Sequence, residues 1–123
     1  MPGWRLYAVR IFVSDWNRAL DFYTKTLEMP IAFADEAVGW AELGIDGSHL
    51  ALERAAPGDA ESAEYVGRFV GVSLQVPSVA ECYAELSARG VEFLAPPERQ
   101  PWGGVLAHFR DPDGNVLTLL GNG

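Results

Sequence analysis

The chain has 123 residues, 49% of them hydrophobic, and a formal net charge of −8 at pH 7. This length fits one domain with a hydrophobic core of its own. The acidic charge argues against nucleic acid and anionic membrane surfaces as partners, because both require a basic surface on the protein. No segment approaches the ~20 consecutive apolar residues of a membrane span, and the single cysteine, Cys82, excludes an internal disulfide and a cysteine-cluster metal site.

The N-terminal residues MPGWRLYAVRIFVSD alternate in polarity and lack the continuous apolar stretch of a signal peptide. We therefore expect a soluble protein of the cytoplasm. The alternation becomes regular at Val9, Ile11 and Val13, which predicts a strand with these three side chains on one face.

A weak internal repeat relates residues 8–27, AVRIFVSDWNRALDFYTKTL, to residues 71–90, GVSLQVPSVAECYAELSARG, at an offset of 63. Each copy runs from an alternating strand through a polar cap into an amphipathic helix. Ser14 or Asp15 is expected to cap the first helix, and Ser78 with Glu81 forms a capping box for the second.

Short strands follow each predicted helix, and in chain order they cover 31–34, 38–45, 48–54, 91–94, 104–110 and 116–120. Asp46-Gly47 predicts a two-residue hairpin turn in the first half. In the second half, Asp-Pro-Asp-Gly-Asn at 111–115 predicts a turn with Gly114 at a positive φ.

The predicted fold is therefore α+β, with two tandem βαβββ modules that form a curved mixed sheet with helices outside and a cleft inside. Module one covers about 5–54 and module two about 65–121 of a single domain, 1–123. The small, acidic residues 55–64 lack periodicity and are expected to form the linker.

Strand alternation separates two faces of this predicted sheet. With a two-residue turn in the first hairpin, Trp40 lies opposite Glu53, and in the last hairpin His108 lies opposite Thr118. One face of every strand is apolar and suits packing against the helices. The mixed face carries Arg10, Trp40, Glu53, Ser73, Gln75, His108 and Thr118. Because this face also carries large apolar side chains, we expect it to line a half-polar cleft and not to meet bulk water.

Four segments, VRIFVSDWNRALDFYTKTL, SLQVPSVAECYAELSARGVEF, ERQPWGGVLAHF and FRDPDGNVLTLL, together span nearly the whole chain. They resemble the vicinal oxygen chelate superfamily, also called the glyoxalase/bleomycin resistance/dioxygenase group. The resemblance implies the doubled βαβββ fold. It leaves the chemistry open, because members of one fold perform different reactions.

In metal-dependent members of this group, ligands come from the first strand and a late strand of each module. The resemblance implies Ala8, Glu53, Gly71 and Thr118 for these positions. Only Glu53 binds a metal well, since alanine and glycine offer no side-chain donor and a neutral hydroxyl is a poor ligand. A catalytic divalent ion needs about three protein ligands. The main hypothesis therefore has no metal, and the alternative holds one divalent ion with Glu53 and His108.

Gln-Pro-Trp-Gly-Gly at 100–104 is similar to the corresponding segment of bleomycin resistance proteins. This resemblance implies a homodimer that stacks a flat ligand on Trp102, with Trp40 and Phe33 as further aromatic walls. Glu53 would meet a cationic or hydrogen-bond-donating group of the ligand. We thus predict a metal-independent protein that sequesters a flat metabolite or antibiotic, for which the acidic chain permits a positive charge.

Two alternatives remain at this point. The first is a divalent-metal-dependent lyase, isomerase or dioxygenase that uses Glu53 and His108. The second is a structural domain that has no ligand and serves a partner. Single residues have structural alternatives as well: Trp102 and Trp40 suit a core or dimer interface, and Arg10 suits neutralisation of Glu53 or Glu42.

Overall fold

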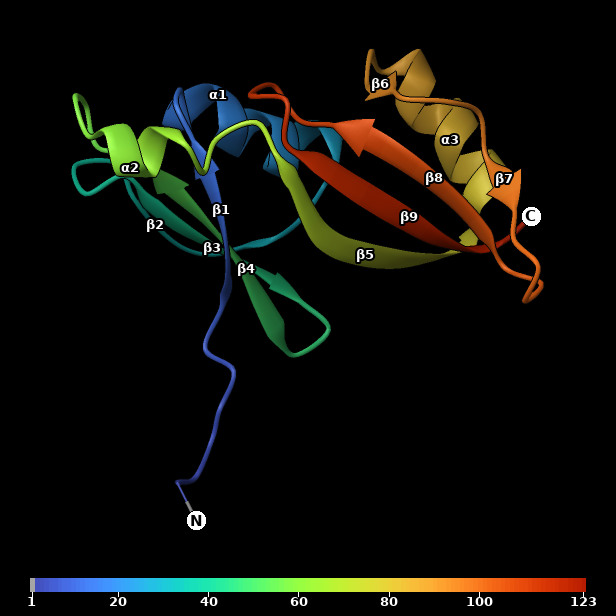
Figure 1. Ribbon diagram of the computed structural model, residues 1–123, viewed down its shortest axis with the longest axis horizontal. Helices are drawn as coiled ribbons and strands as arrows, with labels where there is room; N and C mark the ends of the chain where they lie inside the picture. The colour runs from blue at the N-terminus through green and yellow to red at the C-terminus, as the bar shows by residue number, and fades with distance from the viewer. Residues whose placement is uncertain (1) are drawn as a thin grey trace. The chain divides into compact units, whose positions relative to one another are not determined.

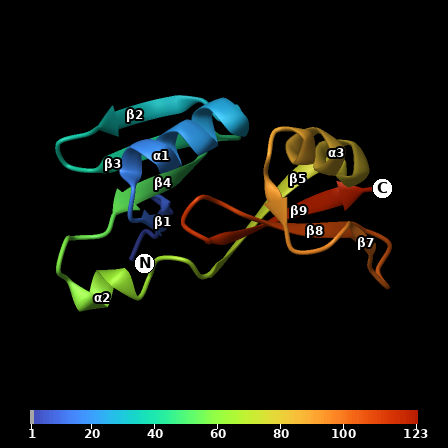
Figure 2. The same ribbon diagram turned by 90° about the horizontal axis from the view of Figure 1, so that it is seen from above.

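The computed structural model describes residues 2–123 and divides into two compact units, of which the first ends at Val66 and the second spans Gly67–Gly123. Each unit contains one mixed β-sheet with its main helix against one face (Figure 1, Figure 2). Among the helices of the described residues, none combines the length and the apolar character that crossing a membrane requires.

Unit 1 is built around a four-stranded sheet. Its elements in chain order are β1 (Val9–Val13), α1 (Trp16–Asp21), the π-helical η1 (Phe22–Thr26), β2 (Ile31–Asp35), β3 (Trp40–Ile45), β4 (Ser48–Arg54) and α2 (Ala60–Ala63). The strand order is β1-β4-β3-β2. β1 is parallel to β4, and the other neighbouring strands are antiparallel.

Unit 2 repeats this arrangement with one additional strand. Its elements are β5 (Phe69–Ser78), α3 (Val79–Ala88), β6 (Glu92–Phe93), β7 (Glu98–Arg99), β8 (Val105–Arg110) and β9 (Val116–Asn122). The strand order is β5-β9-β8-β6, with β7 also paired to β8. As in unit 1, the first strand is parallel to the last. The predicted α+β class with two βαβββ modules is confirmed, whereas the cleft shared by the modules stays a prediction.

The helix starts follow the internal repeat. Asp15 caps α1 by accepting a hydrogen bond from the Arg18 backbone N–H at 3.1 Å. Ser78 caps α3 by accepting one from the Glu81 backbone N–H at 3.2 Å. The two caps are 63 residues apart, which is the offset of the repeat, so both helices begin where the sequence predicts.

Both hairpins have the predicted register. Trp40 pairs with Glu53 and His108 pairs with Thr118. The turn residues Asp46 and Gly47 both have positive φ, at 47° and 76°, as a type I′ turn requires. The apolar faces of the strands form the buried core of each unit, which includes Ile11, Val13, Ala41, Leu43 and Leu52 in unit 1 and Ala107, Phe109, Leu117 and Leu119 in unit 2.

A buried polar network closes the last hairpin. Asp111 Oδ1 accepts hydrogen bonds from the backbone N–H groups of Asp113 and Asn115, both at 2.9 Å. The fully buried Asn115 donates to Asp111 Oδ2 and accepts from the Gly67 backbone N–H at 2.8 Å. The turn therefore has a second role beyond reversing the chain, because it fastens the first residue of unit 2 to the β8–β9 hairpin.

Three details differ from the predicted elements. The first helix continues as the π-helical η1 instead of a regular α-helix. The linker at 55–64 is not irregular throughout, because Asp59 caps the single turn α2 by accepting from the Glu61 backbone N–H at 3.0 Å. The short strand β7 was not expected, since two residues are too few to show an alternating pattern.

Candidate functional site

Trp102 lies in a tight loop between β7 and β8. The Gly103 backbone N–H donates to the Gln100 carbonyl at 2.9 Å, and the Gln100 N–H donates to the Gly104 carbonyl at 2.8 Å. Pro101 presets φ at the second position of this turn, and Gly103 adopts a φ of +100° that other residues avoid. The loop thus presents the Trp102 side chain with 64% of the residue exposed.

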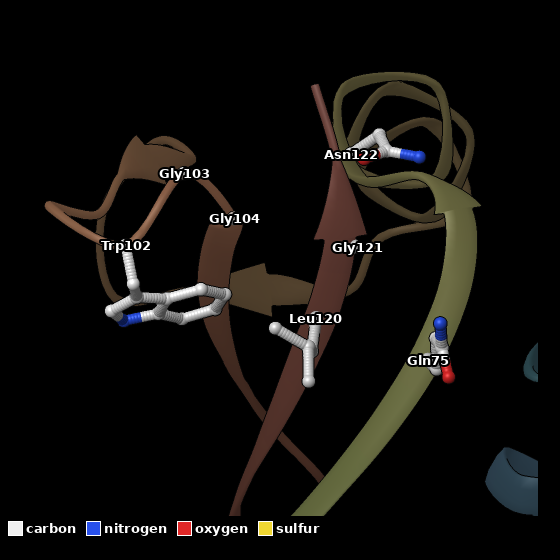
Figure 3. A pocket seen from close by; sticks show the side chains of 7 residues that line it. All are labelled: Gln75, Trp102, Gly103, Gly104, Leu120, Gly121 and Asn122. Carbon is white, nitrogen blue, oxygen red and sulfur yellow. The ribbon is translucent and has the colours of Figure 1, made fainter.

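Gly104 explains how the indole is oriented. A methyl group on Gly104 would overlap with the ring carbons Cζ3 and Cη2 of Trp102 and would lie 2.9 Å from Cε3. The six-membered part of the indole therefore covers the Gly104 backbone, in the space that a side chain would take (Figure 3). Glycine at this position permits the observed placement of Trp102.

A pocket of about 420 Å³ opens beside this indole, within the usual size range of small-molecule sites. It is lined by Gln75, Trp102, Gly103, Gly104, Leu120, Gly121 and Asn122. In Figure 3 the Leu120 side chain lies between the indole and Gln75. At Gly121 a side chain would collide with the Val76 carbonyl oxygen, so glycine there lets β5 and β9 approach closely.

The other site residues predicted in unit 2 form a row across the same sheet. Ser73 pairs with Thr118, and Thr118 pairs with His108. Nδ1 of His108 lies 2.8 Å from Oγ1 of the buried Thr118, so the two side chains share a hydrogen bond. These three residues are not part of the pocket lining, whereas Gln75, two residues further along β5 than Ser73, is.

The predicted residues of unit 1 gather on the mixed face of the other sheet. Arg10 Nη1 lies 2.9 Å from Glu53 Oε1, so Glu53 is neutralised by the cation that the sequence suggests. Trp40 pairs with Glu53 across the hairpin and is half-buried. Phe33 lies on the edge strand β2, opposite Glu42, and is half exposed. Across this sheet, the ion pair on β1 and β4 is thus followed by Trp40 on β3 and Phe33 on β2.

Glu42 is a residue of this face that was not among the predicted site residues. Its Oε2 accepts hydrogen bonds from Trp40 Nε1 at 2.9 Å and from the Tyr7 hydroxyl at 2.8 Å, while its Oε1 lies 3.2 Å from His49 Nδ1. The hydrogen bond from Trp40, then that from Tyr7, lowers the pKa of Glu42 below its usual value. Conversely, donation to Glu42 raises the pKa of Tyr7. Strand alternation places Glu42 beside Trp40 and could have identified this contact.

The residues at the expected metal positions do not fit a catalytic metal. Gly71 has a φ of +74°, a conformation that favours glycine and provides no ligand atom. The Thr118 hydroxyl is engaged by His108, and the Glu53 carboxylate is engaged by Arg10. Within each unit, the described residues include no cluster of three His, Cys, Asp or Glu side chains that could hold a metal ion. These positions therefore support no metal-assisted step.

Comparison with solved structures gives close matches over the entire fold. A superfamily member from Sphaerobacter thermophilus DSM 20745 is 31% identical in sequence, with 99% of this chain and 100% of that chain covered and a TM-score of 0.84. TnmS3, an antibiotic binding protein from Streptomyces sp. CB03234, is 30% identical, with 100% and 99% covered and a TM-score of 0.79.

Sequence comparison also gives matches along most of the chain. YraH, an uncharacterised protein of Bacillus subtilis strain 168, is 25% identical over 129 residues, which cover 94% of this chain and 96% of YraH. The family model described as "Glyoxalase/Bleomycin resistance protein/Dioxygenase superfamily" matches residues 5–119. Since this match includes both βαβββ units and the Trp102 loop between β7 and β8, the chain belongs to the glyoxalase/bleomycin resistance protein/dioxygenase superfamily.

Proposed function

We propose that the protein sequesters a flat small molecule, a metabolite or an antibiotic, without catalysis and without a metal ion. The observation that carries this proposal is the pocket of about 420 Å³ beside Trp102, which is lined in part by the exposed indole. Stacking on an aromatic ring contributes about 0.5–1.5 kcal/mol beyond the burial of area. The similarity to TnmS3, an antibiotic binding protein, supports the same class of ligand.

The contacts of the polar residues favour binding over catalysis. The acidic and imidazole groups that a reaction would use are tied to neighbours: Glu53 to Arg10, and His108 to Thr118. A general base must be within hydrogen-bond reach of the proton that it removes. In the Trp102 pocket the lining offers no acidic or imidazole side chain among the described residues, so it can hold a ligand but has no group to move a proton.

Calorimetric titration of the protein with a panel of planar aromatic antibiotics tests the proposal. We expect saturable binding of at least one compound, and a marked loss of affinity in Trp102→Ala. Trp4→Ala is a matched control, because Trp4 is 86% exposed and belongs to unit 1. Absence of binding across a broad panel, or equal affinity of Trp102→Ala and the wild type, would contradict the proposal.

We further propose that the protein acts as a homodimer in the cytoplasm; the resemblance of residues 100–104 to bleomycin resistance proteins supports the dimer. One chain has a mass of 13.4 kDa. Light scattering on the purified protein should give twice this mass. A monomer at micromolar concentration would contradict this part of the proposal and leave ligand binding to be judged separately.

A further inference from the structure

Every residue that lines the Trp102 pocket is uncharged, although the chain as a whole is strongly acidic. The sequence contains 17 Asp and Glu residues and nine Lys and Arg residues. None of them lines the pocket, whose walls are two carboxamides, an indole, one leucine and three glycines. A charged group that leaves water is costly without a compensating charge, and no side chain of this lining carries one. The lining therefore suits an uncharged part of a ligand.

The two carboxamides of the lining form no hydrogen bond with another described residue of the protein. Of the five Asn and Gln side chains, Asn17, Gln100 and Asn115 form hydrogen bonds within the protein. Gln75 and Asn122 have no such bond to any described residue, and both line the pocket. Each carboxamide offers two N–H donors and a carbonyl acceptor. These groups remain available for the edge of a ligand.

One charged side chain, that of Arg99, forms a hydrogen bond with a residue of the lining. Arg99 Nη1 donates a hydrogen bond to the carbonyl oxygen of Gly103 at 3.1 Å, and Gly103 belongs to the lining. A guanidinium at this distance from the wall disfavours a cation in the pocket. Glu53, on which a cationic ligand was expected, belongs to unit 1 and is paired with Arg10.

We propose that this pocket selects an uncharged planar ring system with carbonyl or hydroxyl groups on its edge over ions of the same shape. The inference rests on the proposed function and specifies its ligand class. The Trp102 indole contacts the face of the ring system, and Gln75 and Asn122 form hydrogen bonds with its edge.

Three tricyclic probes of matched shape test the selectivity: neutral acridone, the 9-aminoacridinium cation and the acridine-9-carboxylate anion. The calorimetry is done at about 0.5 M salt, because this salt concentration shortens the Debye length and weakens the attraction of the acidic chain for cations. At this salt concentration acridone should bind at least about fivefold more tightly than either ion, which corresponds to about 1 kcal/mol, because the lining does not compensate the desolvation of a charge. An ion that binds as tightly as acridone, or failure of all three probes to bind, overturns the inference.

The variant Gln75→Glu provides a second readout, because it keeps the shape of the side chain and adds one negative charge in the pocket. Acridone should bind more weakly to this variant and 9-aminoacridinium more tightly. Asn17→Asp makes the same change of charge on α1 in unit 1 and should leave the ranking unchanged. Equal effects of both variants would show a long-range charge effect and contradict the inference.

Trp102→Ala separates this inference from the proposed function. If 9-aminoacridinium binds most tightly and its binding depends on Trp102, the proposed function stands and the neutral selectivity is wrong. If Trp102→Ala leaves the affinities of all bound probes unchanged, the proposed site itself is wrong.

Discussion

Gly104 is the residue whose substitution tests most directly how the pocket wall is built. In Gly104→Ala the new methyl group would occupy the position of the indole atoms Cζ3 and Cη2 of Trp102. A β-carbon cannot approach that closely, and the backbone of Gly104 is held by its hydrogen bond to Gln100. The indole, which is the more mobile partner, must therefore leave its present position.

The expected magnitudes differ for stability and for binding. Trp102 is 64% exposed, so roughly 90 Å² of a side chain of about 250 Å² is covered, which corresponds to at most about 2 kcal/mol. Replacing glycine by alanine stabilises the folded state by about 0.4–1 kcal/mol, because it lowers the conformational entropy of the unfolded chain. The free energy of unfolding should thus fall by less than about 2 kcal/mol. Loss of stacking worth about 0.5–1.5 kcal/mol should weaken ligand binding about twofold to thirteenfold.

Calorimetry with acridone or the best antibiotic of the panel measures the affinity, and urea unfolding measures the stability. Gly44→Ala is the control, because the nearest atom to its new β-carbon is 3.9 Å away and its φ is not positive. Binding by Gly104→Ala that equals the wild type, while Trp102→Ala is impaired, would show that the position of the indole above Gly104 does not matter. That result would refute the reasoning from geometry.

Three further predictions concern the polar contacts. Because the pKa of Glu42 is lowered in the folded protein, its carboxylate stabilises the fold at pH values above 4.5, its usual pKa, and this contribution is lost as the pH falls through the lowered pKa. Urea midpoints measured from about pH 6 to about pH 3 should therefore decrease more steeply for the wild type than for Glu42→Gln. Thr118→Val removes the partner of His108 and should cost about 1 kcal/mol in urea unfolding, whereas Thr118→Ser should cost less because it keeps the hydroxyl. Asn115→Ala should cost about 2 kcal/mol, since it removes the buried hydrogen bond to Asp111 Oδ2 and the part-buried ones from the backbone N–H groups of Gly67 and Arg68, and a thermal melt unchanged from the wild type would contradict this.

The strand registers were predictable because local turn chemistry determines them. Asp46-Gly47 allows a two-residue turn with positive φ, and this alone places Trp40 opposite Glu53. The cap at Ser78 was predictable for the same reason, since its hydrogen bond spans only three residues. Features that depend on neighbours in sequence could therefore be read from the chain.

Contacts between distant segments were harder to predict. Glu42 receives its hydrogen bond from Tyr7, 35 residues away, and no local pattern indicates where the residues before β1 run. The overlap between Trp102 and a Gly104 side chain likewise depends on the folded path of the loop. The resemblance of residues 100–104 to bleomycin resistance proteins implied an aromatic wall at Trp102, and strand alternation placed Gln75 among the predicted site residues. Asn122, in contrast, was recognised as a polar companion only from the paired strands β5 and β9.

The connection that carries Trp102 has a consequence for how such a chain can change over time. In unit 1 only 36–39 join β2 to β3, whereas in unit 2 the residues 94–104 join β6 to β8 and include β7. The longer connection branches from the sheet without altering the β8–β9 register. Insertions and exchanges in surface loops are tolerated far better than changes in paired strands. A duplicated module can thus diversify what it recognises at one hairpin tip while its copy preserves the scaffold.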